Sequence, residues 1–262
     1  MNLELITTSP QARKHTTPIL FVHGMWHAAW CWQEYFMPYF ADQGYEVHAL
    51  SLRGHGASES AKRFWRTSLN DYVSDLSQVI GRMEQKPILV GHSMGGLVIQ
   101  KYIEKHEVPA AILLASIPPG GVMAATIRTF LKHPLIMLKI NLTFSLYHLV
   151  SAPELAREAF FSPEMPEETV NKYFNLLQDE AYRAYVDAMG LNLSHPKPQK
   201  FPMLVLGASN DKLIIPKEVE ATAKAYGTKA EIFPDMAHDM MVEPCWQSVA
   251  EKMLTWLNEN RL

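Results

Sequence analysis

The sequence LVGHSMGGLV at residues 89–98 places one serine, Ser93, among glycines at the point where one apolar segment ends and another begins. The residues before Ser93 have the composition of a buried strand, and those from Met94 onward have the apolar spacing of a helix. We therefore predict that Ser93 lies on a sharp turn from strand to helix. Gly91 and Gly95 suit such a turn because a side chain at either position would collide across it. The free amides and partial positive charge of the helix N-terminus are directed toward negative charge that would develop at this serine.

Short apolar segments alternate with helical patterns along the rest of the chain. Helices are predicted over residues 68–83 and 246–259, where apolar residues recur at helical spacing. Continuous apolar strands separated by helices are typical of a parallel sheet that is covered on both faces. The predicted fold is therefore α/β, with a mostly parallel β-sheet flanked by helices. The predicted strands are residues 18–24, 45–52, 86–93, 110–116, 201–209 and 229–235.

One long segment, residues 118–199, interrupts this alternation because it contains no convincing strand. It is rich in Met, Phe, Tyr and Leu and has proline and glycine at both ends. We interpret it as a helical cap inserted between two sheet strands, with residues 1–117 and 200–262 forming the core. The alternative is an ordinary helical segment that packs on the same sheet.

Composition excludes several classes of protein. The chain has 262 residues, of which 48% are hydrophobic and 19% charged, and its net charge is −3. No block of Lys or Arg indicates a nucleic-acid partner. No apolar run reaches the roughly 18 residues of a membrane span, and no secretory signal is visible, so we expect a cytoplasmic protein. Cys31 and Cys245 have no metal-ligand spacing around them, so we expect no metal. Composition does not indicate the oligomeric state.

A serine hydroxyl needs a base, and the base is usually a histidine oriented by a carboxylate. Of the 11 histidines, His238 lies between the last predicted strand and the last helix, where a loop reaches over the carboxyl ends of the strands. Asp211 lies just past the end of the strand at 201–209. The order Ser93, Asp211, His238 is the one expected for a nucleophile on a strand-to-helix turn. Asp235 and Asp239 are interpreted as solvated or capping residues.

The oxyanion of an acyl-transfer reaction needs two hydrogen-bond donors. The backbone amide of Met94, directly after Ser93, is the first candidate. The amide of Met25 is the second, because it lies in the turn after the strand at 18–24, where Gly24 permits close approach. His23 is expected to brace that turn rather than to titrate in catalysis. This chemistry requires no cofactor.

These residues together resemble the α/β-hydrolase superfamily. The resemblance covers nearly the whole chain and rests on motifs that occur in the family order. They are His23-Gly24, RGHGAS at 53–58, GHSMGG at 91–96, Asp211 and His238. The glycines of 53–58 are expected to form a turn after the second strand. As an alternative, Arg53 in this motif would clamp a substrate carboxylate.

A finer similarity lies in HGMWHAAWCW at residues 23–32. It resembles the H-G-x-x-H-x-x-W-x-W stretch of the plant methylesterase and hydroxynitrile lyase branch and its bacterial relatives, with matches at His27, Trp30 and Trp32. The two tryptophans are expected to pack a helix on the sheet. In lyases of that branch a threonine follows the first histidine and a lysine follows the catalytic one. Here Gly24 and Asp239 stand in those places, which favours ester hydrolysis.

The predicted function is therefore a serine hydrolase that cleaves a carboxylic ester, or a thioester, through an acyl-enzyme. The substrate is expected to be a small molecule with an apolar acyl or alcohol group, because aromatic and aliphatic residues crowd the segment 118–199. A C–C bond hydrolase, a cofactor-free dioxygenase or a perhydrolase on the same fold remains an alternative. A non-catalytic small-molecule binding protein is a further one. The crowded residues are Phe130, Leu131, Ile136, Met137, Leu138, Phe144, Leu146, Tyr147, Phe160, Phe161, Tyr173 and Phe174.

Overall fold

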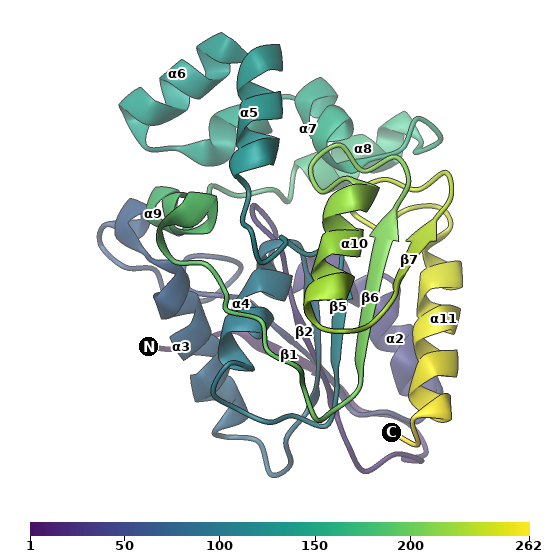
Figure 1. The fold of residues 1–262 in the computed structure, drawn as a ribbon. Coiled ribbons are helices and arrows are strands. Elements are labelled where there is room, and N and C mark those ends of the chain that lie inside the picture. Colours follow the sequence, from purple (N-terminus) through teal and green to yellow (C-terminus); the bar gives the residue numbers. More distant parts are fainter.

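The computed structural model describes residues 1–262 and contains one seven-stranded sheet in the order β1-β3-β2-β4-β5-β6-β7. All neighbouring pairs are parallel except β1 with β3 (Figure 1). The mostly parallel sheet predicted from the sequence is confirmed, and each predicted strand is present. The strands are β1 (Leu5–Thr8), β2 (Ile19–Val22), β3 (Val47–Leu50), β4 (Ile88–His92), β5 (Ala111–Leu114), β6 (Met203–Ala208) and β7 (Ala230–Phe233).

Helices cover both faces of the sheet. Helices α3, α4 and α10 lie on one face, while α2 and α11 pack on each other at the other face (Figure 1). The helices predicted over 68–83 and 246–259 are confirmed as α3 and α11. No helix combines the length and the apolar character needed to cross a membrane. The bounds are α1 (Trp30–Gln33), α2 (Phe36–Asp42), α3 (Leu69–Ile80), α4 (Met94–Tyr102), α10 (Pro216–Ala225) and α11 (Trp246–Glu259), with a short 3₁₀ turn η1 (Phe64–Arg66).

The start of α3 shows how local sequence fixes an element. Ser68 is the N-cap, and its hydroxyl oxygen accepts a hydrogen bond from the amide of Asp71. The Asp71 carboxylate in turn accepts from the amide of Ser68 at 2.8 Å. This capping box satisfies two amides that a helix end leaves free. The apolar side of α3 is then buried, through Leu69, Tyr72, Leu76, Val79 and Ile80.

The chain between β5 and β6 forms helices and turns, which lie over the carboxyl ends of the strands (Figure 1). They cover the edge of the sheet at which the predicted catalytic residues lie. Treating residues 118–199 as a separate cap stays a prediction. The elements are α5 (Met123–Lys132), α6 (Pro134–Thr143), the 3₁₀ turn η2 (Leu146–Leu149), α7 (Pro153–Phe160), α8 (Glu167–Phe174), α9 (Tyr182–Val186) and the π-helical turn η3 (Asp187–Leu191).

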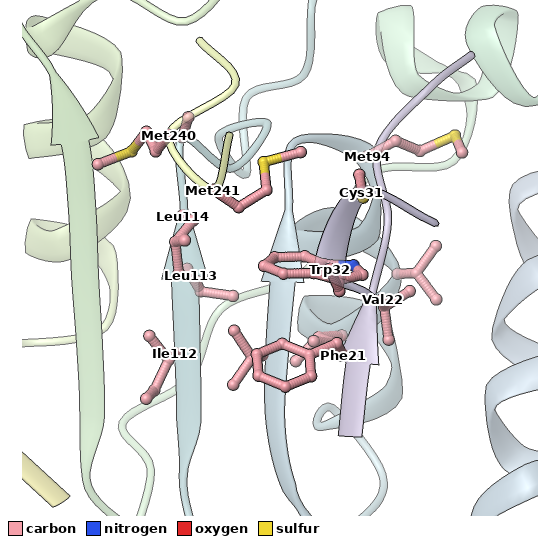
Figure 2. Packing of buried hydrophobic residues seen from close by; sticks show 14 of the residues in the cluster. Phe21, Val22, Cys31, Trp32, Met94, Ile112, Leu113, Leu114, Met240 and Met241 are labelled. Atoms are coloured by element: carbon pink, nitrogen blue, oxygen red, sulfur yellow. The ribbon is translucent and has the colours of Figure 1, made fainter. Parts of the chain in front are cut away.

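The core beneath this edge is tightly packed. Phe21 of β2 stacks on Trp32 of α1 with ring centroids 4.7 Å apart, and both side chains are fully buried (Figure 2). Met241, from the segment before α11, is buried in the same region. The packing role predicted for Trp32 is thus observed. A rigid core of this kind holds the loops at the strand ends in fixed positions.

Candidate active site

Ser93 follows the last residue of β4 and is the N-cap of α4. Its backbone has φ 51° and ψ −116°, a conformation that L-residues rarely adopt. The Ser93 amide donates to the carbonyl of Leu114 in β5 at 3.0 Å, and the Ser93 carbonyl accepts from the amide of Ile117 at 3.1 Å. These bonds to the neighbouring strand and the chain after it hold the strained residue in place. The predicted strand-to-helix turn is therefore observed.

Two glycines allow this turn to touch the turn after β2. A Cβ on Gly95 would collide with the carbonyl oxygens of Val22 and His23, so a side chain there is excluded by backbone atoms. A Cβ on Gly24 would lie 2.9 Å from the Cβ of Ser93. The turn carrying Met25 therefore packs directly against the serine.

The two amides predicted to bind an oxyanion lie in these turns. Met94 is the first residue of α4, and an amide at this position has no partner within its helix. The amide of Met25 donates no hydrogen bond to the protein, and both residues are buried. Buried amides without partners are costly unless something accepts from them. Their availability suits an anionic ligand, while their role in catalysis stays a prediction.

His238 and Asp211 form a hydrogen-bonded pair. Nδ1 of His238 donates to Oδ2 of Asp211 over 2.7 Å, and both side chains are almost completely buried. The other carboxylate oxygen of Asp211 accepts from the amides of Leu213 and Ile214 at 2.8 and 2.9 Å. Both carboxylate oxygens of Asp211 are thus held by hydrogen bonds, and the bond to Nδ1 orients the imidazole of His238.

The structure also brings the loop of His238 to the residue next to Ser93. Nε2 of His92 donates to the carbonyl of His238 at 3.0 Å, and the two rings lie 4.6 Å apart. The hydroxyl of Ser93 itself makes no hydrogen bond within the protein. All three predicted residues therefore lie at one edge of the sheet, with the imidazole and the acid joined directly.

The electrostatics of His238 suit a base. Burial lowers its pKa, but the charge and hydrogen bond of Asp211 outweigh burial, so the pKa of His238 lies above 6.5. His92 is different, because burial and the neighbouring His238 lower its pKa to about 3. His92 is therefore neutral at physiological pH, whereas His238 is the histidine of this pair that takes up a proton more readily.

The prediction for Asp239 is wrong. It is fully buried rather than solvated, and Oδ2 accepts a hydrogen bond from Nε2 of His27 over 2.8 Å. Sequence reasoning set Asp239 aside because a direct neighbour of His238 rarely points back at its ring. Asp239 does not point back, since it faces His27, 212 residues earlier in the chain. Asp235, by contrast, is exposed as expected.

Other motif residues have structural partners. Nδ1 of His23 donates to the carbonyl of Gly24 at 2.7 Å, and its Nε2 accepts from the amide of Leu52 at 3.0 Å, as expected for a brace. Arg53 forms an ion pair with Asp75, which leaves no free guanidinium for a substrate. The alternative of a clamp at Arg53 is therefore not supported.

A pocket opens at Ser93 and lies beneath α5 and α6. Its volume is about 60 Å³, and ten of its 13 lining residues are hydrophobic. Of the crowded residues named from the sequence, only Met137 lines it, while Phe130, Leu131 and Leu138 face solvent. The lining residues are Met25, Trp26, Ser93, Ile117, Val122, Ala125, Thr126, Thr129, Met137, Leu149, Tyr185, Leu213 and Ile214.

A family model described as the alpha/beta hydrolase family matches residues 19–251. Methylesterase 18 of Arabidopsis thaliana is 25% identical over 218 residues, which cover 75% of this chain and 80% of that protein. Other plant relatives at 33–34% identity align over only 40–44% of their own length.

Two solved structures are similar over almost the whole chain. An esterase from Exiguobacterium antarcticum has a TM-score of 0.74 at 18% identity and covers 98% of this chain and 95% of its own. A bromoperoxidase from Bacillus anthracis has a TM-score of 0.75 at 19% identity, with coverage of 98% and 96%. At such identities the similarity establishes the fold and leaves the reaction to be argued from the site.

Proposed function

This chain belongs to the alpha/beta hydrolase family, and from that premise we propose that it is a serine hydrolase of carboxylic esters. The observation that carries the proposal is the buried His238–Asp211 pair at the same sheet edge as the strained turn of Ser93. The relatives named as methylesterase and esterase support the same class of reaction.

In the first half of the reaction, Oγ of Ser93 attacks the ester carbonyl carbon. Nε2 of His238 takes the hydroxyl proton, and Asp211 stabilises the resulting imidazolium. The carbonyl oxygen becomes an oxyanion, which accepts hydrogen bonds from the amides of Met25 and Met94. The carbon–oxygen bond to the alcohol then breaks, and His238 returns the proton to the departing alcohol.

In the second half, a water molecule attacks the acyl-enzyme. Nε2 of His238 takes a proton from this water and then gives it to Oγ of Ser93 as the carboxylic acid leaves. The serine and the imidazole are thereby restored. Each proton in the cycle is held by a residue of the chain, so the reaction needs no cofactor.

The pocket favours a substrate with an apolar acyl or alcohol group. A volume of about 60 Å³ holds only a few water molecules, so the side chains above Ser93 must shift to admit an acyl chain. Residues 118–199 supply many of these side chains, including Ala125, Thr126 and Met137. We therefore assign that segment the role of a cap over the serine.

A panel of p-nitrophenyl esters and thioesters of increasing acyl length tests this function. We expect turnover that rises from acetate to a medium-chain ester, and a loss in Ser93→Ala on the order of 10⁶-fold in kcat. Ser74→Ala, an exposed serine on α3, is the control and should retain turnover.

Two results would overturn the proposal. One is ester turnover that survives in Ser93→Ala. The other is peroxide-dependent bromination by wild-type protein that hydrolyses no ester, because that activity would match the bromoperoxidase that shares the fold.

A further inference from the structure

The outer side of α5 and α6 is unusually apolar for a protein surface. On α5 the side chains of Ile127, Phe130 and Leu131 are at least half exposed, and on α6 Leu135 and Leu142 are 78% and 72% exposed. Their spacing places each set on one side of its helix. We call this surface the apolar face, and it consists of Met123, Ile127, Phe130, Leu131, Leu135, Leu138, Leu142 and Phe144.

The apolar face lies opposite the pocket. Residues Ala125, Thr126 and Thr129 of α5 line the pocket of Ser93, whereas Ile127 and Phe130 of the same helix face solvent. Figure 1 shows α5 and α6 standing furthest from the sheet. These two helices therefore separate the pocket from whatever contacts the apolar face.

A cationic cluster borders this face. The ring of Phe144 stacks on that of Trp65 at 5.1 Å, which joins the apolar face to η1. Trp65 is 37% exposed, and Arg66 lies over its ring at 4.7 Å. Lys62, Arg63 and Arg66 are exposed and form no salt bridge. We call these three residues the basic cluster.

The distribution of charge decides which partner fits. Residues 117–153 contain no Asp or Glu, and of their cations Arg128 and Lys132 pair with Glu218 and Glu158 while Lys139 forms no salt bridge. A second copy docked through the same face would bring Lys139 and the basic cluster near their own counterparts, with no carboxylate of the face to balance them. At an anionic lipid surface the leucines can be buried among acyl chains, and the basic cluster is attracted to the negative headgroups. Tryptophan side chains such as Trp65 favour the interface between the two regions.

We propose that the apolar face and the basic cluster dock this protein on anionic phospholipid surfaces. The leucines of α5 and α6 enter the boundary between headgroups and acyl chains, and Lys62, Arg63 and Arg66 contact the headgroups. Docking would place the two helices above the pocket against a source of apolar molecules. The docking itself does not depend on the reaction at Ser93.

Co-sedimentation with vesicles tests the docking, using phosphatidylcholine alone or phosphatidylcholine and phosphatidylglycerol in equal parts. We expect binding to the mixed vesicles and much weaker binding to the neutral ones. Leu135→Ser with Leu142→Ser should weaken binding at least about tenfold. Lys62→Gln, Arg63→Gln and Arg66→Gln together should weaken it by on the order of 100-fold, at about fivefold per cation.

The controls separate docking from folding and from catalysis. Leu176→Ser changes an exposed leucine outside the apolar face and should bind as wild type does. Ser93→Ala should also bind, so a failure of ester turnover leaves this result unaffected. Wild-type protein that binds neither vesicle overturns the proposal, as does undiminished binding by both multiple variants. A dimer that Leu135→Ser with Leu142→Ser converts to a monomer, without vesicle binding, overturns it in favour of a second copy.

His27 and Asp239 form a buried pair beside the predicted catalytic residues. Nδ1 of His27 lies 2.7 Å from the carbonyl oxygen of Met25, and Nε2 lies 2.8 Å from Oδ2 of Asp239. A carbonyl oxygen can only accept, so Nδ1 of His27 carries a proton. Burial raises the pKa of Asp239, but the charge and hydrogen bond of His27 outweigh it and lower that pKa. Oδ2 of this carboxylate lies 2.8 Å from Nε2, so the ring of His27 bridges the Met25 carbonyl and Asp239.

We infer that this hydrogen-bonded pair positions the catalytic groups relative to one another, an inference that rests on the proposed ester hydrolysis. His27 holds the peptide that follows Met25, whose amide is an oxyanion donor. Asp239 directly follows His238 and is fixed through its own amide to the carbonyl of Phe160 at 3.0 Å. The pair thus ties the oxyanion turn to the loop of the base.

The test replaces the pair by neutral groups, His27→Gln with Asp239→Asn, and includes each single variant. We expect the double variant to fold, kcat to fall by about tenfold or more, up to the 10²- to 10³-fold that one oxyanion donor supplies, and KM to stay within about twofold. If the two residues act as a unit, kcat of each single variant should fall by no more than kcat of the double variant.

Near-normal kcat in a folded double variant would show that the pair is merely structural. A parallel rise in KM would also count against positioning. Failure of all three variants to fold would assign the pair to stability and overturn the inference. Ser93→Ala measured alongside shows whether ester turnover itself depends on the serine.

Discussion

Ser93 differs from its neighbours in having a strained backbone conformation. Its positive φ is held by hydrogen bonds to Leu114 and Ile117, so the strain persists because the surrounding strands determine the turn. The same turn places the Met94 amide at a helix start. The turn therefore brings the Ser93 hydroxyl, at the pocket, next to a backbone amide that has no partner within its helix.

The pH dependence of ester turnover follows from His238. Only neutral His238 can take the serine proton, so kcat/KM should rise with pH through a pKa above 6.5. Asp211→Asn removes the charge that raises this pKa and leaves burial, which lowers it. We therefore expect the acid limb to move to lower pH and kcat to fall by about 10⁴-fold. An acid limb that stays in place in this variant would contradict the assigned roles, as measured by initial rates from pH 5 to 9.

The same pKa shift has a consequence for stability. Because the folded-state pKa of His238 is raised, its pairing with Asp211 contributes stability that is fully present below the unfolded pKa of about 6.5. This contribution is lost as the pH rises through the folded pKa. This loss should be absent from the free energy of unfolding of Asp211→Asn, measured in urea over the same pH range as the matched comparison.

At the scale of the elements, α3 is tied to the turn after β3. The Asp75 carboxylate is 1% exposed and accepts from the backbone amide of Arg53 at 3.0 Å and from its guanidinium at 2.6–3.0 Å. This turn begins the RGHGAS motif. The arginine of the motif therefore stabilises the fold by joining this turn to α3.

Asp75→Asn should lower the free energy of unfolding. It leaves the partly buried guanidinium of Arg53 without its main counter-charge, which costs about 3 kcal/mol when one partner of a buried pair is removed. Urea unfolding should show a lower midpoint at constant slope. Asp42→Asn changes an exposed aspartate at the end of α2 and should stay within about 0.5 kcal/mol of wild type. An equal effect of the two substitutions would refute a structural role for the Arg53–Asp75 pair.

At the scale of the whole molecule, buried elements could be predicted from the sequence better than surface contacts. The strands around Ser93 are continuous apolar runs, and each was predicted. Strand β1 was missed because Leu5–Thr8 alternates exposed and half-buried residues at the sheet edge, a pattern with few apolar side chains.

Contacts between distant segments were harder to predict. Asp239 and His27 are 212 residues apart, and no local pattern shows that they meet. The segment 118–199 was predicted to be helical, but composition does not tell which side of α5 or α6 faces the pocket. Phe130 and Leu131 therefore proved to be exposed, while smaller residues such as Ala125 line the pocket.

The proposed reaction requires that Ser93 is a nucleophile activated by His238. The most direct measurement is the mass of the protein after reaction with a fluorophosphonate, followed by peptide mapping. We expect one phosphonyl group on the peptide containing Ser93, with no adduct in Ser93→Ala and slow labelling in a variant that lacks the imidazole of His238. Unmodified wild-type protein, or an adduct on another residue, would contradict it.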